Sequence, residues 1–237
     1  MAEWFEQWFG EEYLALYPHR DQADAEKAVA LIERTIPWQP GMRVLDIASG
    51  PGRHAVALEA RGVSPVGVDL SMALLRKAQE VTGSPLVRAD MRHLPVRDES
   101  CDLALNLFTS FGYFGTDAEH RAALSGMIAT LRHGGWFVLD FLQADLVRRT
   151  LVPEDHTILG GQAVHIRRRI SDDDRYVVKE IDTGNGRVFE ERVRLFSPAE
   201  LESMLSTGLE IVARFGDYDG GPLTPDSPRA FLIGRRP

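Results

Sequence analysis

The sequence contains a single cysteine, Cys101, among 237 residues. One cysteine can build neither an intrachain disulfide framework nor a cysteine-rich zinc site. No apolar run approaches the roughly 20 residues that cross a bilayer, and the N-terminal stretch lacks the basic and apolar regions of a signal peptide. These absences predict a cytoplasmic protein without structural disulfides and without a membrane partner.

Basic residues are also few relative to acidic ones. Lys and Arg number 27 against 35 Asp and Glu, which gives a formal net charge of −8. Broad, nonspecific binding to nucleic acid needs a basic surface, so the charge balance argues against a nucleic-acid partner, although it leaves room for a local basic groove. The length suits one large α/β domain or two small ones, and we expect a monomer or a homodimer.

Short apolar runs alternate with helical patterns between residues 43 and 140. The apolar runs are rich in Val, Leu and Ile and too short to be isolated helices. This alternation predicts a parallel sheet with helices on both faces and right-handed crossovers. The clearest helix is expected over residues 116–134, where Thr116 and Glu119 form a capping box and Gly134 can close the C-terminus.

The rhythm changes after residue 150. Three strands separated by the turns SDDD and TGNG predict an antiparallel meander at 163–170, 175–182 and 187–195. A helix capped by Ser197 and two final strands follow. We therefore expect three parts: an N-terminal helical lid segment at 1–37, a core at 38–150 and 196–237, and an antiparallel β insertion at 151–195 that serves as a substrate lid.

The stretch VLDIASGPGRHA, residues 44–55, has the pattern of a buried strand that runs into a glycine turn. From Gly50 it matches G-x-G-x-x-G/A, and Asp69 follows Gly50 by 19 residues. These features are also the fingerprint of a dinucleotide fold. Asp46, however, stands just before the loop, where its charge would repel a pyrophosphate at the helix N-terminus. The position favours a cationic ligand.

A second strand-end carboxylate, Asp90, follows Asp69 by 21 residues. A ligand with an amine and a sulfonium, a ribose and an adenine needs acceptors in this order. Asp69 can accept from both ribose hydroxyls, Asp90 can accept from the adenine amino group, and Met91 can pack on the ring. Either carboxylate alone could be an N-cap or a solvated loop residue. Their joint spacing favours S-adenosylmethionine as the cofactor.

The same motifs resemble those of the class I S-adenosylmethionine-dependent methyltransferases, with a small-molecule type similar to the amino-sugar N,N-dimethyltransferases. VLDIASGPG resembles the first motif, VGVDLS the second, ADM the third and CDLALNLFTSFGYF the fourth. The resemblance implies an α/β, Rossmann-like sheet of seven strands in the order 3-2-1-4-5-7-6, with strand 7 antiparallel and helices on both faces. Ala48 replaces the usual first glycine, and we expect no loss of binding from it.

The resemblance and the motifs together define candidate site residues. Those expected to bind the cofactor are Tyr17, Arg20, Asp46, Ala48, Gly50, Gly52, Asp69, Leu70, Asp90, Met91 and Asn106. Tyr13, Phe111 and Arg229 are candidates for substrate binding. His19 and Tyr113 are candidate catalytic groups, because a base is needed only where the nucleophile arrives protonated. The sequence offers no cluster of metal ligands around these positions, so we expect no metal requirement.

The substrate is less specified. The fourth strand ends in Asn106-Leu107-Phe108-Thr109, without the Asn/Asp-Pro-Pro-Tyr/Phe of methyltransferases that act on base amines. This predicts methyl transfer to a nitrogen or oxygen atom of a small molecule. Arginines of the insertion fit a solvated strand face or, alternatively, an acidic or phosphorylated substrate. His120 and His133 are expected on a helix surface.

Three alternatives stay open at this point. The first is a nicotinamide-dependent oxidoreductase, which the glycine loop allows and Asp46 and Asp90 oppose. The second is a methyltransferase that acts on RNA or protein. The third is a binding protein that keeps the cofactor pocket without catalysis.

Overall fold

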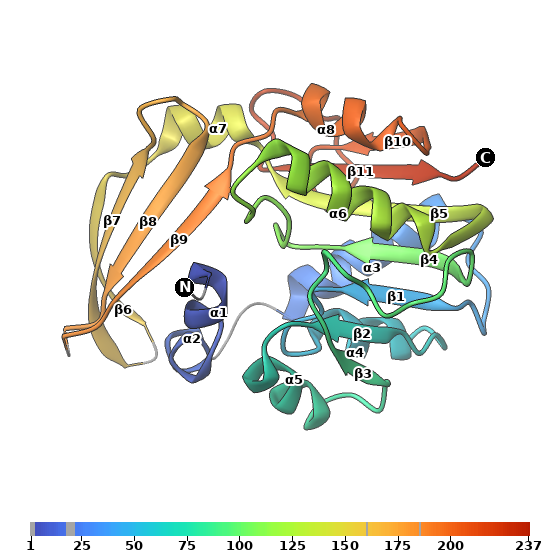
Figure 1. The fold of residues 1–237 in the computed structure, drawn as a ribbon, viewed down its shortest axis with the longest axis horizontal. Helices are drawn as coiled ribbons and strands as arrows, with labels where there is room; N and C mark the ends of the chain where they lie inside the picture. Colours follow the sequence, from blue (N-terminus) through green and yellow to red (C-terminus); the bar gives the residue numbers. More distant parts are fainter. Residues whose placement is uncertain (1–2, 18–21, 160, 185) are drawn as a thin grey trace.

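The computed structural model describes residues 3–17, 22–159, 161–184 and 186–237. These residues form a seven-stranded core sheet and a separate four-stranded sheet, which lie apart in Figure 1. The core sheet contains β1 (Val44–Ile47), β2 (Val66–Asp69), β3 (Leu86–Arg88), β4 (Cys101–Asn106), β5 (Leu131–Leu142), β10 (Glu210–Phe215) and β11 (Arg229–Arg235).

The core strands are ordered β10-β11-β5-β4-β1-β2-β3. Strands β1 to β5 pair in parallel, whereas β11 is antiparallel to both β5 and β10. When the core strands alone are numbered along the chain, β10 and β11 become strands 6 and 7. Read from the other edge, the order is then 3-2-1-4-5-7-6, with an antiparallel seventh strand. The predicted fold class is therefore confirmed. No helix in the described ranges has the length and apolarity of a membrane span.

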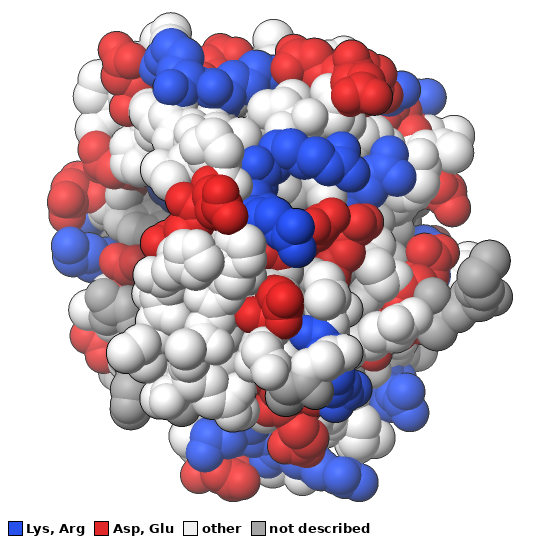
Figure 2. Space-filling model, turned by 90° about the vertical axis from the view of Figure 1, so that its left-hand side faces the viewer, with Lys and Arg blue, Asp and Glu red and all other residues white. Residues whose placement is uncertain are grey.

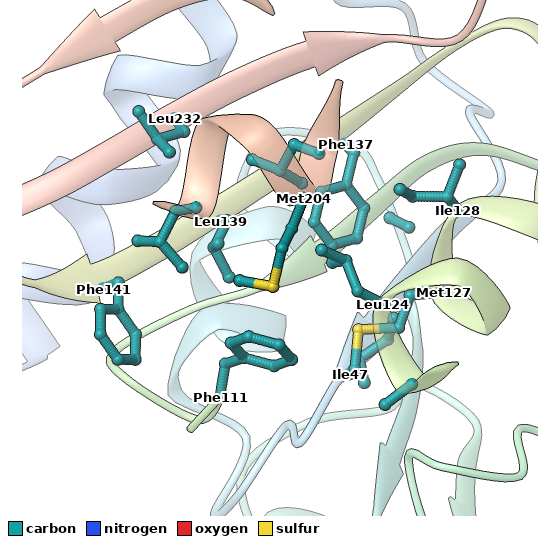
Figure 3. Close-up of a cluster of buried hydrophobic side chains, with 14 of the residues drawn as sticks. Ile47, Phe111, Leu124, Met127, Ile128, Phe137, Leu139, Phe141, Met204 and Leu232 are labelled. Carbon is teal, nitrogen blue, oxygen red and sulfur yellow. The ribbon is translucent and has the colours of Figure 1, made fainter. Parts of the chain in front are cut away.

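Helices cover the core sheet on both faces, as strands buried on both sides require. Side chains alternate between faces along a strand, so Ile47 packs in one apolar cluster with α6 and α8, whereas Val44 packs in another with α3 and α4. Figure 3 shows part of the first cluster, where Met204 of α8 and Leu124 of α6 meet core strands. The helices are α3 (Gln22–Thr35), α4 (Arg53–Glu59), α5 (Met72–Gln79), α6 (Asp117–Ala129), α7 (Ala144–Thr150) and α8 (Pro198–Leu205).

Helix α6 begins as predicted and ends earlier than predicted. The amide of Glu119 donates to Oγ1 of Thr116 at 3.2 Å, and the amide of Thr116 donates to Oε2 of Glu119 at 2.8 Å. The helix ends at Ala129, because Leu131 already pairs with β4 as the first residue of β5. Gly134, expected to close the helix, lies inside β5 with φ of +75°.

The insertion between α7 and α8 is an antiparallel sheet of four strands rather than three. They are β6 (Glu154–Leu159), β7 (Gln162–Ile170), β8 (Tyr176–Asp182) and β9 (Val188–Arg194), paired in that order. β6 was not predicted from the sequence, because its exposed positions carry Glu, His and Ile in turn and give no hydrophobic alternation. Pairing with β7 over its whole length determines its conformation.

Two N-terminal helices, α1 (Trp4–Trp8) and α2 (Glu11–Leu16), lie between the insertion and the core sheet (Figure 1). Trp8 is buried against apolar side chains of the insertion, including Ile181 and Phe189. Nε1 of Trp8 also donates to Oε1 of Glu191 in β9 at 2.5 Å. The N-terminal helices and the insertion thus pack together as one layer beside the core sheet.

Candidate functional site

A cavity of about 470 Å³ lies at the carboxyl ends of β1, β2 and β4. Its wall on the core side includes the loop after β1 and the strand ends that carry Asp69 and Asp90, and its opposite wall includes Phe5, Phe9 and Tyr13 from the N-terminal segment. Ligands in open α/β sheets bind at this edge, and the volume is within the range of small-molecule sites. The cavity is the candidate active site.

The loop after β1 contains a run of left-handed backbone conformations, with φ of +59° at Ala48, +58° at Gly50 and +86° at Gly52. A Cβ on Gly50 would meet no heavy atom within 4 Å, and Gly50 lines the cavity. A Cβ on Gly52 would lie 3.1 Å from Cβ of Ala78, so this glycine lets α4 approach α5. Gly52 is not among the residues that line the cavity. Ala48 lines it and bears a left-handed strain of roughly 1–2 kcal/mol.

Asp69 ends β2 and lines the cavity. Its Oδ2 accepts the amide of Gly50 at 2.8 Å, and its Oδ1 accepts the amide of Ser71 at 2.8 Å. Burial raises the pKa of this carboxyl against the lowering effect of those amides. A carboxylate has about four acceptor positions, so two remain for a ligand. Leu70, the next residue, also lines the cavity.

Asp90 and Met91 line the cavity after β3. Oδ2 of Asp90 lies 2.6 Å from Nη2 of Arg92, and Oδ1 accepts the Arg92 amide at 2.8 Å. Burial opposes ionisation here, but the hydrogen bonds from Arg92 hold the pKa of Asp90 below its usual value. Arg92, which fixes the carboxylate in one orientation, was not predicted as a site residue. The sequence feature that could have indicated it is a basic residue two positions after the acidic residue that follows the strand.

Asp46 is buried behind the cavity and is not among the residues that line it. Burial first, and the charge of Asp69 second, raise the pKa of Asp46 to about 7. Within the part of the chain that the structure describes, its Oδ2 has no hydrogen-bond partner, and neither has Oγ of Ser49, which lines the cavity. A buried carboxylate of this kind is stabilised by a nearby positive charge. These atoms therefore fit a cofactor with a cationic centre.

The cavity is also lined by Tyr113, Phe108 and a buried histidine, His54. The Tyr113 hydroxyl donates to the Thr109 carbonyl at 2.7 Å. Burial, reinforced by Arg53 and Arg229, lowers the pKa of His54 to about 3 and keeps its ring neutral. His54 was not among the candidate site residues predicted from the sequence. Its position at the start of α4, at the carboxyl end of β1, was the signal for a site residue.

Phe108 and Thr109 adopt left-handed backbone conformations, with φ of +58° and +61°. Such values are rare for bulky and β-branched residues and persist only where neighbours impose them. The amide of Phe108 donates to Oδ2 of Asp140 at 2.9 Å, and Nη2 of Arg229 donates to Oγ1 of Thr109 at 2.9 Å. Asp140 and Arg229 thus hold the backbone and side chain of the loop that carries Phe108, a residue of the cavity wall.

Several predicted site residues lie away from the cavity. Nδ2 of Asn106 donates to the Ile47 carbonyl at 3.2 Å in the core, and Phe111 is fully buried and stacks on Phe196. Arg229 contacts Asp140 and Thr109 instead of lining the cavity. Tyr17 accepts a hydrogen bond from Lys179 of the insertion, at 2.7 Å. The cavity lining contains none of these residues.

Two of the candidates, His19 and Arg20, lie outside the described residues. The expectation that His120 and His133 lie on a helix surface was wrong. His120 is fully buried, and its Nε2 accepts the Phe114 amide at 3.2 Å. His133 is exposed, but it belongs to β5 because the helix ends before it.

The insertion packs on the N-terminal helices, which in turn line the cavity. Among the described residues of β6 to β9, none lines the cavity. Its arginines are largely paired with carboxylates, as Arg194 is with Asp117 and Glu200. This pairing accounts for the basic insertion without an anionic ligand.

Comparison with known proteins bears on this site. A family model described as a methyltransferase domain matches residues 44–135. The phthiotriol/phenolphthiotriol dimycocerosates methyltransferase of Mycobacterium tuberculosis is 35% identical over 103 residues, which are 41% of this chain and 36% of that protein. The chain therefore spans little more than a third of the length of this curated relative.

Solved structures match nearly the whole chain. The CcbJ methyltransferase from Streptomyces caelestis has a TM-score of 0.81 at 21% identity, covering 97% of this chain and 98% of the other. The sugar N-methyltransferase KedS8 from Streptoalloteichus has a TM-score of 0.71 at 27% identity, covering 96% and 93%. CalS10, an amino pentose methyltransferase from Micromonospora echinaspora solved with S-adenosylmethionine bound, has a TM-score of 0.69 at 25% identity, covering 96% and 97%.

These similarities agree with the geometry of the cavity. The strand-end carboxylates and the glycine loop lie inside residues 44–135, the range that the methyltransferase model matches. A nicotinamide-dependent oxidoreductase is not supported by either observation. Together, the matched domain, the solved structures and the cavity support an S-adenosylmethionine-dependent methyltransferase.

Proposed function

We propose that this enzyme methylates a nitrogen atom of a small amine, with amino sugars as the favoured acceptor class. The observation that carries the proposal is the cluster of aromatic side chains from α1, α2 and the loop after β4 that lines the cavity. A cavity of about 470 Å³ lined in this way fits a small acceptor better than RNA or a polypeptide. The similarity to KedS8 and CalS10 supports the same substrate class.

The chain's own residues bind and orient the partners. We assign the ribose hydroxyls to Asp69, the adenine to Asp90 and Met91, and the positive charge of the cofactor to Asp46. When bound, S-adenosylmethionine supplies a methyl group on a positively charged sulfur. An in-line displacement on that carbon requires positioning and exclusion of water more than it requires an acid or base. Phe5 and Phe9 supply the exclusion, because both line the cavity from α1 and the residue after it.

We assign to Tyr113 the role of orienting the amine that receives the methyl group. Its hydroxyl proton is donated to Thr109 at 2.7 Å, so the oxygen presents a lone pair with which it can accept a hydrogen bond from the acceptor amine. This contact would aim the nitrogen lone pair without removing a proton in advance. His54 is neutral in this environment and therefore does not repel an acceptor that carries positive charge after transfer. No role is assigned to Phe111 or Asn106, which are buried in the core.

The test is a methyl-transfer screen on the purified full-length chain. Small amines, including amino sugars, are incubated with S-adenosylmethionine beside analogues in which a hydroxyl replaces the amine, and the products are identified by mass. We expect the amines to gain methyl groups and the hydroxyl analogues to stay unchanged. Equal methylation of both series would contradict the nitrogen assignment. Methylation of RNA or peptide alone would contradict the small-molecule assignment.

A further inference from the structure

We propose that Glu154, His156 and His165, on the outer face of the insertion, form a binding site for Zn²⁺. One donor atom from each of the three side chains lies within 4.8 Å of the others. The cluster shares no residue with the lining of the methyl-transfer cavity. It is thus a second site, independent of the acceptor proposed above.

Strand register brings the three side chains together. His156 of β6 lies directly opposite His165 of β7 in an antiparallel pair, where facing Cβ atoms are about 4.5–5.5 Å apart. The two rings stack with centroids 4.2 Å apart and planes 4° from parallel. Glu154 precedes His156 by two positions and therefore points to the same face. The strand register therefore places all three side chains on one face of the insertion.

The shared face is open to solvent. Val164 and Ile166, the neighbours of His165 in β7, are buried against the N-terminal helices, so His165 points the opposite way. Glu154 and His156 are exposed, and His165 is partly exposed. Figure 2 views the molecule from the side on which the insertion lies, where acidic and basic side chains interleave. A hydrated ion can reach the cluster without any opening of the fold.

The donor set selects the metal. Two imidazole nitrogens and one carboxylate oxygen are ligands that Zn²⁺ prefers, and a three-ligand set leaves the fourth tetrahedral position to water. Mg²⁺ and Ca²⁺ prefer oxygen ligands, and only one of the three side chains in this cluster, Glu154, offers oxygen. In the metal-free protein Nε2 of His165 lies 2.5 Å from Oε1 of Glu154. An entering ion would take the place of this contact, with both imidazoles neutral.

The surrounding charges favour a cation. Arg167 lies opposite Glu154, but its guanidinium is 3.7 Å from Glu180, which balances it. Asp182 of β8 lies opposite His165 and adds a second carboxylate on this face. β6 is the edge strand and pairs only with β7 among the described strands. An ion shared by Glu154, His156 and His165 would therefore fasten the edge of the insertion sheet.

The experiment uses the full-length chain without a polyhistidine tag, stripped with a chelator and desalted. Calorimetric titration with Zn²⁺ should give one ion per chain, and Mg²⁺ should give no binding. His156→Ala and His165→Ala should each weaken binding roughly tenfold or more, and Glu154→Gln should weaken it as well. His133→Ala removes an exposed histidine outside the cluster and should leave the affinity unchanged.

Co²⁺ provides a second readout, because four-coordinate Co²⁺ absorbs strongly in the visible range while the hydrated ion does not. The wild-type chain and His133→Ala should show these bands, and His165→Ala should lose them. Circular dichroism shows whether each variant is folded. Absence of Zn²⁺ binding in the wild-type chain would overturn the proposal. So would an unchanged affinity in a folded His156→Ala/His165→Ala double variant.

Discussion

Nε of Arg229 lies 2.7 Å from Oδ1 of Asp140, in an ion pair whose carboxylate is completely buried. The second oxygen of Asp140 accepts the Phe108 amide and the Tyr218 hydroxyl. One buried charge therefore links the β10–β11 loop, strand β11 and the wall of the cavity. Arg229, which the sequence suggested as a substrate ligand, is a support for the loop that contacts the cavity.

Replacing this arginine should leave the Asp140 carboxylate buried without its cation. We expect Arg229→Met to lower the free energy of unfolding by about 3–5 kcal/mol, the scale for breaking a buried pair from one side. Urea unfolding of the wild type and the variant measures this free-energy difference. Arg235→Met, at the exposed end of the same strand, is the matched control and should cost far less. A loss at Arg229 no larger than at Arg235 would show that the pair does not support the fold.

Asp46→Asn should raise stability while weakening cofactor binding. The folded-state pKa of Asp46 is about 7, whereas the unfolded value is near 3.9, so above about pH 4 the folded state holds a proton that the unfolded state has released. Wild-type stability therefore falls, relative to the variant, as the pH rises from about 4 to 7, and the difference is constant above 7. Thermal unfolding of the cofactor-free proteins across this pH range measures the difference in stability between wild type and variant. A difference that is independent of pH would mean that Asp46 ionises normally.

Asp69→Ala should weaken binding of S-adenosylhomocysteine by about 1.5–3 kcal/mol, the scale for hydrogen bonds to a charged group. The same change removes the acceptor for the Gly50 and Ser71 amides, so we also expect a modest loss of stability. Calorimetry on the folded variant measures the affinity. Asp98→Ala, an exposed aspartate in a loop, should bind as the wild type does. An unchanged dissociation constant at Asp69 would place the ribose elsewhere.

Glu191→Ala should weaken the packing of helix α1 against the insertion. The carboxylate accepts from Trp8 Nε1 at 2.5 Å and lies 3.4 Å from Lys179 Nζ. Its loss removes a hydrogen bond to a charged group, so amide hydrogen exchange in α1 should accelerate roughly tenfold or more. Glu190→Ala, on the exposed face of the same strand, is the control. Equal exchange rates in the two variants would mean that Glu191 does not hold α1.

The core was predictable from sequence because its signals are local. The strand that ends at Asp69 is a short apolar run, and the capping box at Thr116 is contained in four residues. Burial of His120 and the pairing of Arg229 with Asp140 were not predictable in the same way. They arise where segments about 76 to 89 positions apart meet, as Phe196 meets His120 and Arg229 meets Asp140. Asn106 and Phe111 fit the fourth motif by position, but the fold turns both into the core.

The hydrogen bond between Trp8 and Glu191 joins residues that are 183 positions apart, and this has a consequence for synthesis of the chain. At about 5–20 residues per second, the apolar face of α1 would wait roughly ten to forty seconds for its partner strand. The strands that carry Asp46 and Asp69, and the strand that precedes Asp90, are all translated in the meantime. We therefore expect the cofactor-binding part of the core to assemble first on the ribosome. Helix α1 would dock, and so complete the cavity wall, only when β9 has emerged.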